Sequence, residues 1–194
     1  MRASLFALPL VLAAGPALAQ DPGSFTGPRV EATVGWDQVG FDLANIGASG
    51  RAHSSDVGYG GTVGYDGLLG TGLVAGVEAG VNASGNSFGY GDATNGGEIR
   101  RRREIDLAAR LGTPVGDRAL LYVKAGYANL QVRESTTIAG TTTDMLRDLD
   151  GVLAGVGAEY RVAPQAYLKA EYRYTNFGSG YEGNSVLTGV GVHF

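Results

Sequence analysis

Apolar and polar residues alternate along most of the chain after residue 29. In the first such run, Val30, Ala32, Val34 and Trp36 occupy one set of alternate positions, and Glu31, Thr33, Gly35 and Asp37 occupy the other. A period of two predicts a β-strand with one apolar and one polar face. Counting this run, 30–37, the pattern occurs eight times, and the other runs are 57–66, 73–82, 104–112, 121–128, 151–160, 168–175 and 186–194. The fold class predicted is all-β, with eight strands.

The connections between these runs alternate in length. Four polar connections are long, at 42–55, 83–99, 133–148 and 177–183, whereas those at 67–70, 113–117 and 162–165 are tight. An even number of strands, with long loops at one end and short turns at the other, is typical of an outer-membrane barrel. We therefore predict an eight-stranded antiparallel up-and-down transmembrane β-barrel with short periplasmic turns and long extracellular loops.

Composition indicates which face of the strands meets lipid. Of 194 residues 33 are Gly, and the polar face of each predicted strand carries glycine and charge. Eight strands leave a lumen just wide enough for side chains to fill it, so the bulky apolar face must point outward. The net charge of −4 argues against nucleic-acid binding. The absence of cysteine excludes disulfides, thiolate metal sites and cysteine nucleophiles.

The first nineteen residues have the pattern of a secretory signal peptide. Arg2 is followed by an apolar run that ends at Gly15 and Pro16, and the sequence Ala17-Leu18-Ala19 forms a small-residue cleavage site. We predict a signal peptide at 1–19, a periplasmic N-terminal segment at 20–28 and the barrel at 29–194. No later segment has the uninterrupted apolar length of a transmembrane helix.

The last two predicted strands carry a family resemblance. The stretch 171–178 and the ending Gly189-Val190-Gly191-Val192-His193-Phe194 resemble the ends of small alphaproteobacterial outer-membrane barrels of the opacity and OmpA-like surface families. The resemblance implies localisation in the bacterial outer membrane, chain ends in the periplasm and loops outside the cell. It also implies that Val190, Val192 and Phe194 form the signal recognised by the barrel assembly machinery.

Charged residues recur on the polar face, which the barrel would turn inward. The predicted interior network contains Glu31, Glu78, Glu104, Asp106, Arg110, Lys124, Glu159, Lys169, Glu171 and Arg173, with Arg100 and Arg102 nearer the outer rim. Six acids and six bases would balance, and we expect them to pair across strands because an unpaired buried charge is costly. The paired charges would plug the lumen. The alternative is a path for ions or small solutes.

A run of four arginines, 100–103, begins the fourth predicted strand. In the register set by Ile105 and Leu107, Arg101 and Arg103 point outward, just above the apolar band. There they would meet the phosphates of lipopolysaccharide, which guanidinium groups bind well. The alternative is a solvated strand end, and a register slip of one residue would exchange this pair for Arg100 and Arg102.

Three other motifs suggest chemistry weakly. His53, Ser54, Ser55 and Asp56 have the residue types of a hydrolytic triad but are consecutive in a predicted loop. The GxGxxG spacing at 178–183 lacks the strand and helix of a dinucleotide site. Asp144, Asp148 and Asp150 do not have the spacing of a calcium loop. We predict no catalytic residues, no cofactor and no metal.

The function predicted is structural: a surface-exposed barrel that supports membrane integrity and presents its loops outside the cell. A narrow channel or weak porin is the first alternative, and a lipid-modifying enzyme of the outer membrane is the second. The expected partners are outer-membrane lipid, lipopolysaccharide and the assembly machinery, without nucleic acid. The sequence does not identify a partner for the loops.

Overall fold

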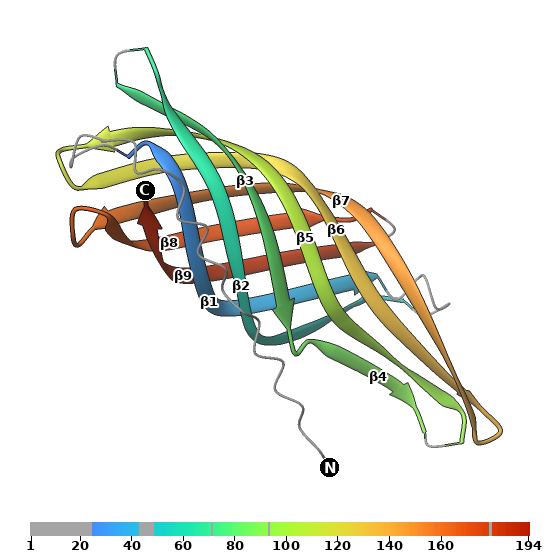
Figure 1. The fold of residues 1–194 in the computed structure, drawn as a ribbon. Helices are drawn as coiled ribbons and strands as arrows, with labels where there is room; N and C mark the ends of the chain where they lie inside the picture. The colour runs from blue at the N-terminus through green and yellow to red at the C-terminus, as the bar shows by residue number, and fades with distance from the viewer. Residues whose placement is uncertain (1–24, 43–48, 71, 93, 179) are drawn as a thin grey trace.

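A computed structural model describes residues 25–42, 49–70, 72–92, 94–178 and 180–194, and these form nine strands curled into a barrel (Figure 1). The strands are β1 (Gly27–Asp42), β2 (Arg51–Leu69), β3 (Leu73–Ser84), β4 (Ser87–Gly91), β5 (Gly96–Val115), β6 (Ala119–Ile138), β7 (Thr141–Arg161), β8 (Ala166–Asn176) and β9 (Tyr181–His193). Each strand pairs antiparallel with its neighbours.

Eight of the nine strands close the ring. β1 pairs with both β2 and β9, and β3 pairs with β5, so the sheet has no open edge within the barrel. The additional strand, β4, pairs only with β5 and extends that side beyond the ring. Closure gives the backbone N–H and C=O groups partners inside the sheet, as a hydrocarbon environment requires.

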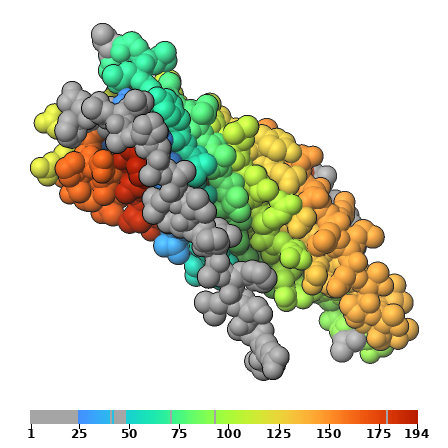
Figure 2. Space-filling view, in the orientation of Figure 1, coloured from blue at the N-terminus to red at the C-terminus, as the bar shows by residue number. Residues whose placement is uncertain are grey.

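The predicted long loops are mostly strand. β6 and β7 continue through the expected loop at 133–148 and turn only at Ala139 and Gly140, whose φ angles of 50° and 77° suit a two-residue hairpin turn. β4 lies inside the expected loop at 83–99, and β2 begins at Arg51. The expected loop lengths are therefore wrong at these positions. Figure 2 shows the β6–β7 hairpin as the far tip of an elongated molecule.

The outer surface of the ring is apolar. Large apolar side chains at alternate positions are exposed on every strand of the ring, for example Val34, Val63, Val77, Leu107, Val123, Val156, Leu168 and Val190. Aromatic side chains are exposed on the same face, including Trp36, Tyr65, Tyr127, Tyr160, Tyr172 and Phe194. An apolar band bordered by aromatic residues is the surface expected against lipid.

The N-terminal prediction lies largely outside the described residues, since these begin at Phe25. The signal peptide at 1–19 and most of the segment at 20–28 are therefore not described. β1 begins at Gly27, two residues before the expected start of the barrel. Among the described residues, no helix is long and apolar enough to cross a membrane.

Candidate functional site

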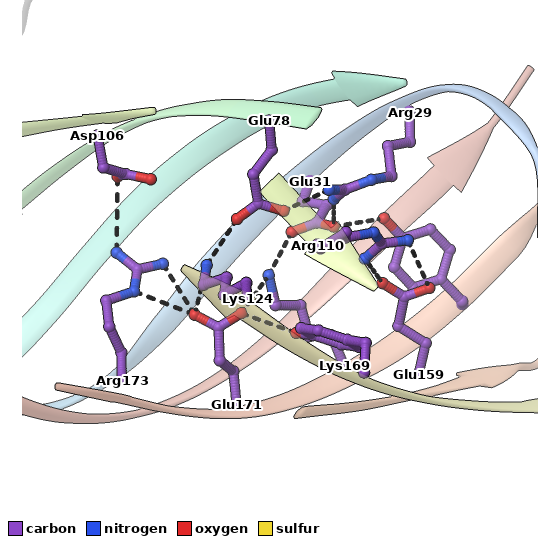
Figure 3. Close-up of polar contacts among 12 residues, drawn as sticks. Arg29, Glu31, Glu78, Asp106, Arg110, Lys124, Glu159, Lys169, Glu171 and Arg173 are labelled. Atoms are coloured by element: carbon purple, nitrogen blue, oxygen red, sulfur yellow. Dashed lines mark hydrogen bonds and ion pairs between the residues drawn. The ribbon is translucent and has the colours of Figure 1, made fainter. Parts of the chain in front are cut away.

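The polar faces of the strands meet inside the barrel as a connected set of ion pairs (Figure 3). The ten residues predicted for the network each have at most 3% of their surface exposed. Four more buried charges join them: Arg29, Asp37, Asp66 and Arg101. We call these fourteen residues the interior network. It contains six bases and eight acids, whereas the sequence prediction had six of each.

Two arginines connect the carboxylates at the end of the network nearest the short turns. Arg29 pairs with Glu31 and Glu78, and its Nε lies 2.9 Å from Asp66 Oδ2. Arg110 donates to both oxygens of Asp66, at 2.7 and 2.6 Å, and pairs with Glu159. Because the planar guanidinium has five donors, each arginine joins carboxylates from several strands.

Two lysines join the middle of the network. Lys124 Nζ lies 2.6 Å from Glu78 and 2.8 Å from Glu171. Lys169 Nζ lies 2.6 Å from Glu31 and 3.0 Å from Glu171. Two tyrosine hydroxyls also donate to these carboxylates, Tyr122 to Glu171 at 2.7 Å and Tyr167 to Glu31 at 2.8 Å. Because of these contacts, few carboxylate oxygens in the middle of the network lack a partner.

Arg173 and Arg101 extend the network toward the long hairpins. Arg173 Nη2 lies 3.0 Å from Glu171, and its Nη1 lies 3.7 Å from Asp106 and 3.8 Å from Glu104. Arg101 pairs with Asp37 and Glu104, both at 2.7 Å. The fourteen residues therefore form one connected cluster that runs along the lumen.

Glycine gives these long side chains their space. A Cβ at Gly155 would lie 3.2 Å from Lys124 Cε, and one at Gly64 would lie 3.0 Å from Arg29 Nε. At Gly80 the same atom would lie 3.0 Å from Asp106 Cγ. Each of these glycines is opposite the charged residue on the neighbouring strand. The high glycine content thus reflects close packing of charged side chains inside a narrow ring.

The prediction that Arg101 points outward is wrong, because β5 contains a bulge. Arg101 is opposite Val132 and Arg103 is opposite Gln131, so Arg102 is an extra residue without a partner in this register. An extra residue reverses the side-chain alternation on one side of the bulge. Arg101 therefore points into the lumen, where its side chain is only 6% exposed.

The other arginines of the run are on or near the outer surface. Arg103 is half-buried, and Arg102 and Arg100 are exposed. The prediction that Arg100 and Arg102 face inward near the outer rim is therefore also wrong. Arg100 pairs with Glu98 at 2.8 Å and is opposite Arg133, which is also exposed. The outer rim thus carries Arg100, Arg102, Arg103 and Arg133, which we call the rim arginines.

Two clusters of buried apolar side chains accompany the interior network inside the barrel. At the short-turn end, Phe25 packs with Val74 and Leu120, and the three are at most 5% exposed. At the other end, buried Leu130, Val132, Leu153 and Phe177 pack together with Ala108 and Ala128. These two apolar clusters were not predicted from the sequence.

Two of the three weak motifs lie within strands. His53 to Asp56 are part of β2 rather than a loop, and successive side chains of a strand point to opposite faces. Asp144, Asp148 and Asp150 accept hydrogen bonds from β6 side chains, the first from Ser135 at 2.6 Å and the second from Gln131 at 3.1 Å. No group of three or more potential metal ligands occurs among the described residues.

Comparison with known proteins decides the family. The sequence profile of the outer membrane protein beta-barrel domain matches residues 5–194. The chain belongs to this family. It is 31% identical over 155 residues to the 22 kDa outer membrane protein of Rhizobium leguminosarum, covering 71% of this chain and 67% of that protein. The protein is therefore an outer-membrane barrel of a Gram-negative cell, as the terminal residues indicated.

Two further comparisons agree. The barrel is 28% identical over 178 residues to outer membrane protein A of Salmonella typhi, which covers 91% of this chain but only 49% of that protein. The chain thus spans about half the length of that relative. The crystal structure of Neisserial surface protein A has the same fold, with a TM-score of 0.57, 20% identity and coverage of 87% and 98% of the two chains.

Four members of the interior network were missed from the sequence, although three of them had a signal. Arg29 lies one position before the first predicted strand. It is two positions before Glu31, so the two side chains would point to the same face. Asp37 and Asp66 occupy polar-face positions of predicted strands. Extending the first run by one residue would have included Arg29, and Asp37 and Asp66 were already on the predicted polar face. Arg101 had no such signal, because the alternation does not reveal the bulge.

Proposed function

We propose that this barrel is a structural, surface-exposed outer-membrane protein whose lumen is closed by paired charges. The observation that carries the proposal is the interior network, in which each base contacts at least one acid. The two apolar clusters add to the proposed closure. The role requires no catalysis, and in an outer-membrane barrel the long hairpins lie outside the cell.

Barrier function in cells tests this role. Cells that lack the protein should become more sensitive to detergent and should regain resistance when the wild-type barrel is supplied. Uptake of small hydrophilic solutes should be the same with and without the protein, because the proposed lumen is closed. A loss of solute uptake on deletion would favour a channel instead.

Phe194 is proposed to direct assembly. Phe194 is 45% exposed, and its backbone N–H donates to Pro28 at the short-turn rim. Phe194→Ala should leave synthesis and signal cleavage intact and lower the amount of folded barrel in the outer membrane. Tyr65→Ala is the matched control, because Tyr65 is an exposed aromatic residue opposite Pro28. Wild-type levels of folded Phe194→Ala would refute this assignment.

The rim arginines are proposed to contact lipopolysaccharide phosphates. They lie on β5 and β6 on the long-hairpin side of Ile105. The proposal takes the lipid-facing band of β5 to end near Ile105, which would bring these arginines to the level of the lipid head groups. The double variant Arg103→Gln/Arg133→Gln should weaken binding to lipopolysaccharide vesicles by about 2 kcal/mol, at roughly 1 kcal/mol for each cation near an anionic surface. Vesicles of dephosphorylated lipid provide the control, and equal binding of both proteins to phosphorylated vesicles would rule out the contact.

A further inference from the structure

The outer part of β7 has one open edge. Residues 141–150 pair with β6 on one side, whereas the pairing of β7 with β8 begins only at Val152 and Asn176. Figure 1 shows β6 and β7 continuing past the end of β8. On the side away from β6, no described residue forms a backbone hydrogen bond with 141–150. This edge therefore presents the N–H and C=O groups of every second residue to an added strand.

The open edge of β7 is regular and accessible. Its register with β6 is unbroken, and its sequence contains neither proline nor glycine. Every residue from 141 to 150 is exposed except Leu149, which is half-buried. Proteins usually protect a long edge with proline, a bulge or a covering segment. An extended peptide can add a strand to an edge that lacks these features.

The outward face of this edge is acidic. Asp144, Asp148 and Asp150 alternate along β7 with the same parity as Val152, which is exposed on the lipid face. Their hydrogen bonds come from neutral side chains of β6. The exposed ion pairs of the described residues include none with these three carboxylates. Their negative charge is therefore available to a basic partner.

The inward face of the edge is more apolar. Met145 is 60% exposed, and half-buried Leu149 packs against the buried apolar cluster at this end of the barrel. Arg147, between them on the same face, lies 3.7 Å from Glu134. A strand added to β7 would therefore meet carboxylates with one set of alternate side chains and apolar groups with the other.

We propose that this edge binds an extended segment of another protein, with basic side chains at alternate positions and apolar side chains between them. The segment would pair antiparallel with 141–150 and so continue the line of β8. Its basic side chains would lie beside the three aspartates, and its apolar ones beside Met145 and Leu149. The long hairpins of an outer-membrane barrel lie outside the cell, so the partner is extracellular.

A second copy of this chain suits the edge poorly. Antiparallel pairing of two β7 edges centred on Leu146 would place Asp144 of each copy opposite Asp148 of the other, and centring on Arg147 would place Asp144 opposite Asp150. In-register parallel pairing would place each aspartate opposite its own copy. Like charges directly opposite each other are destabilising, so the acidic face favours a basic partner over self-association. This inference does not rest on the closed lumen, because peptide binding and conductance are measured separately.

Amide hydrogen exchange of the full barrel in phosphatidylcholine nanodiscs tests the proposal, with an end-blocked octapeptide of alternating lysine and valine as the probe. At roughly ten times its dissociation constant, the peptide should slow exchange of alternate amides in 141–150 about tenfold. Empty nanodiscs measure binding to lipid alone. No protection in 141–150 would overturn the proposal. Protection that appears without peptide as the protein concentration rises would also overturn it, by assigning the edge to a second copy.

Two N-methylated forms of the peptide test the strand pairing itself. One carries methyl groups on the lysine amides and the other on the valine amides, so each blocks one of the two edges of the peptide. Because only one edge would pair with β7, one form should bind at least about tenfold more weakly and the other should bind like the unmodified peptide. Equal affinities of the two forms would contradict strand addition.

Charge variants test the complementarity. The triple variant Asp144→Asn/Asp148→Asn/Asp150→Asn keeps an acceptor oxygen at each position but removes the charges, and should weaken peptide binding about tenfold. Glu98→Gln is the matched control, because it removes an acid from β5 of the same sheet, where both edges are already paired with β4 and β6. It should bind the peptide like the wild type. Unchanged affinity in the folded triple variant would refute the assigned role of the acidic face.

Discussion

Replacing Lys124 with methionine is expected to lower the free energy of unfolding of the barrel by about 3–5 kcal/mol, the cost of breaking a buried ion pair. Lys124 Nζ is the shared partner of Glu78 and Glu171, and all three side chains have no exposed surface. Methionine keeps a similar length and leaves both carboxylates with one cation fewer. Urea unfolding in lipid vesicles measures the effect, and the single tryptophan, Trp36, reports it from the lipid face.

Val123→Met is the matched control, because Val123 is the preceding residue on β6 and is 54% exposed on the outward face. It should change the unfolding free energy little. The double variant Lys124→Met/Glu171→Gln should recover part of the loss, since it removes one of the two carboxylates left without this cation. Equal unfolding midpoints for Lys124→Met and the wild type would mean that the interior network does not stabilise the barrel.

Placing a guanidinium on the lipid face at Ala109 should cost about 2–4 kcal/mol. Ala109 is exposed, is opposite Val77 and Ala125, and is near the middle of the outward apolar positions of β5. Ala109→Arg therefore puts a charge close to the bilayer midplane. The same urea titration measures the loss.

Ser49→Arg provides the comparison, because Ser49 is exposed in the connection between β1 and β2. That variant should unfold at the wild-type midpoint, since its charge remains in water. If Ala109→Arg were as stable as Ser49→Arg, the outward face would not be in contact with lipid and the barrel would be inside out.

The alternation of residues was sufficient to predict the ring, because the membrane imposes it. Residues that face lipid, such as Leu107 and Val123, must be apolar, whereas the narrow lumen also accepts charged residues, such as Asp106 and Lys124, when they are paired. Period-two alternation therefore indicated the strands and their faces, and the terminal residues indicated the family.

Beyond the membrane the alternation disappears although the strands continue. The hairpin of β6 and β7 at 133–148 contains Thr136, Thr137 and Thr142, and exposed polar side chains occur on both faces. Water on both sides removes the reason for an apolar face, so a strand there has the composition of a loop. For this reason the sequence overestimated the lengths of the connections.

The bulge at Arg102 could not be predicted from the sequence, for a different reason. Four consecutive arginines have no polarity contrast, so neither register is distinguishable from composition. The pairing of β5 with β6 shows which register is formed, and this register places Arg101 between Asp37 and Glu104. The one extra residue of the bulge thus turns Arg101, a predicted lipid contact, into the lumen.

The conductance of the purified wild-type barrel in a planar lipid bilayer tests the central claim most directly. Side chains that fill an eight-stranded lumen leave no continuous file of water, and here two apolar clusters accompany the interior network. The account predicts no steady current across the physiological range of voltage, with insertion verified by a heat-shift gel of the same sample. A stable conductance, selective for cations because eight acids face six bases, would contradict the closed lumen.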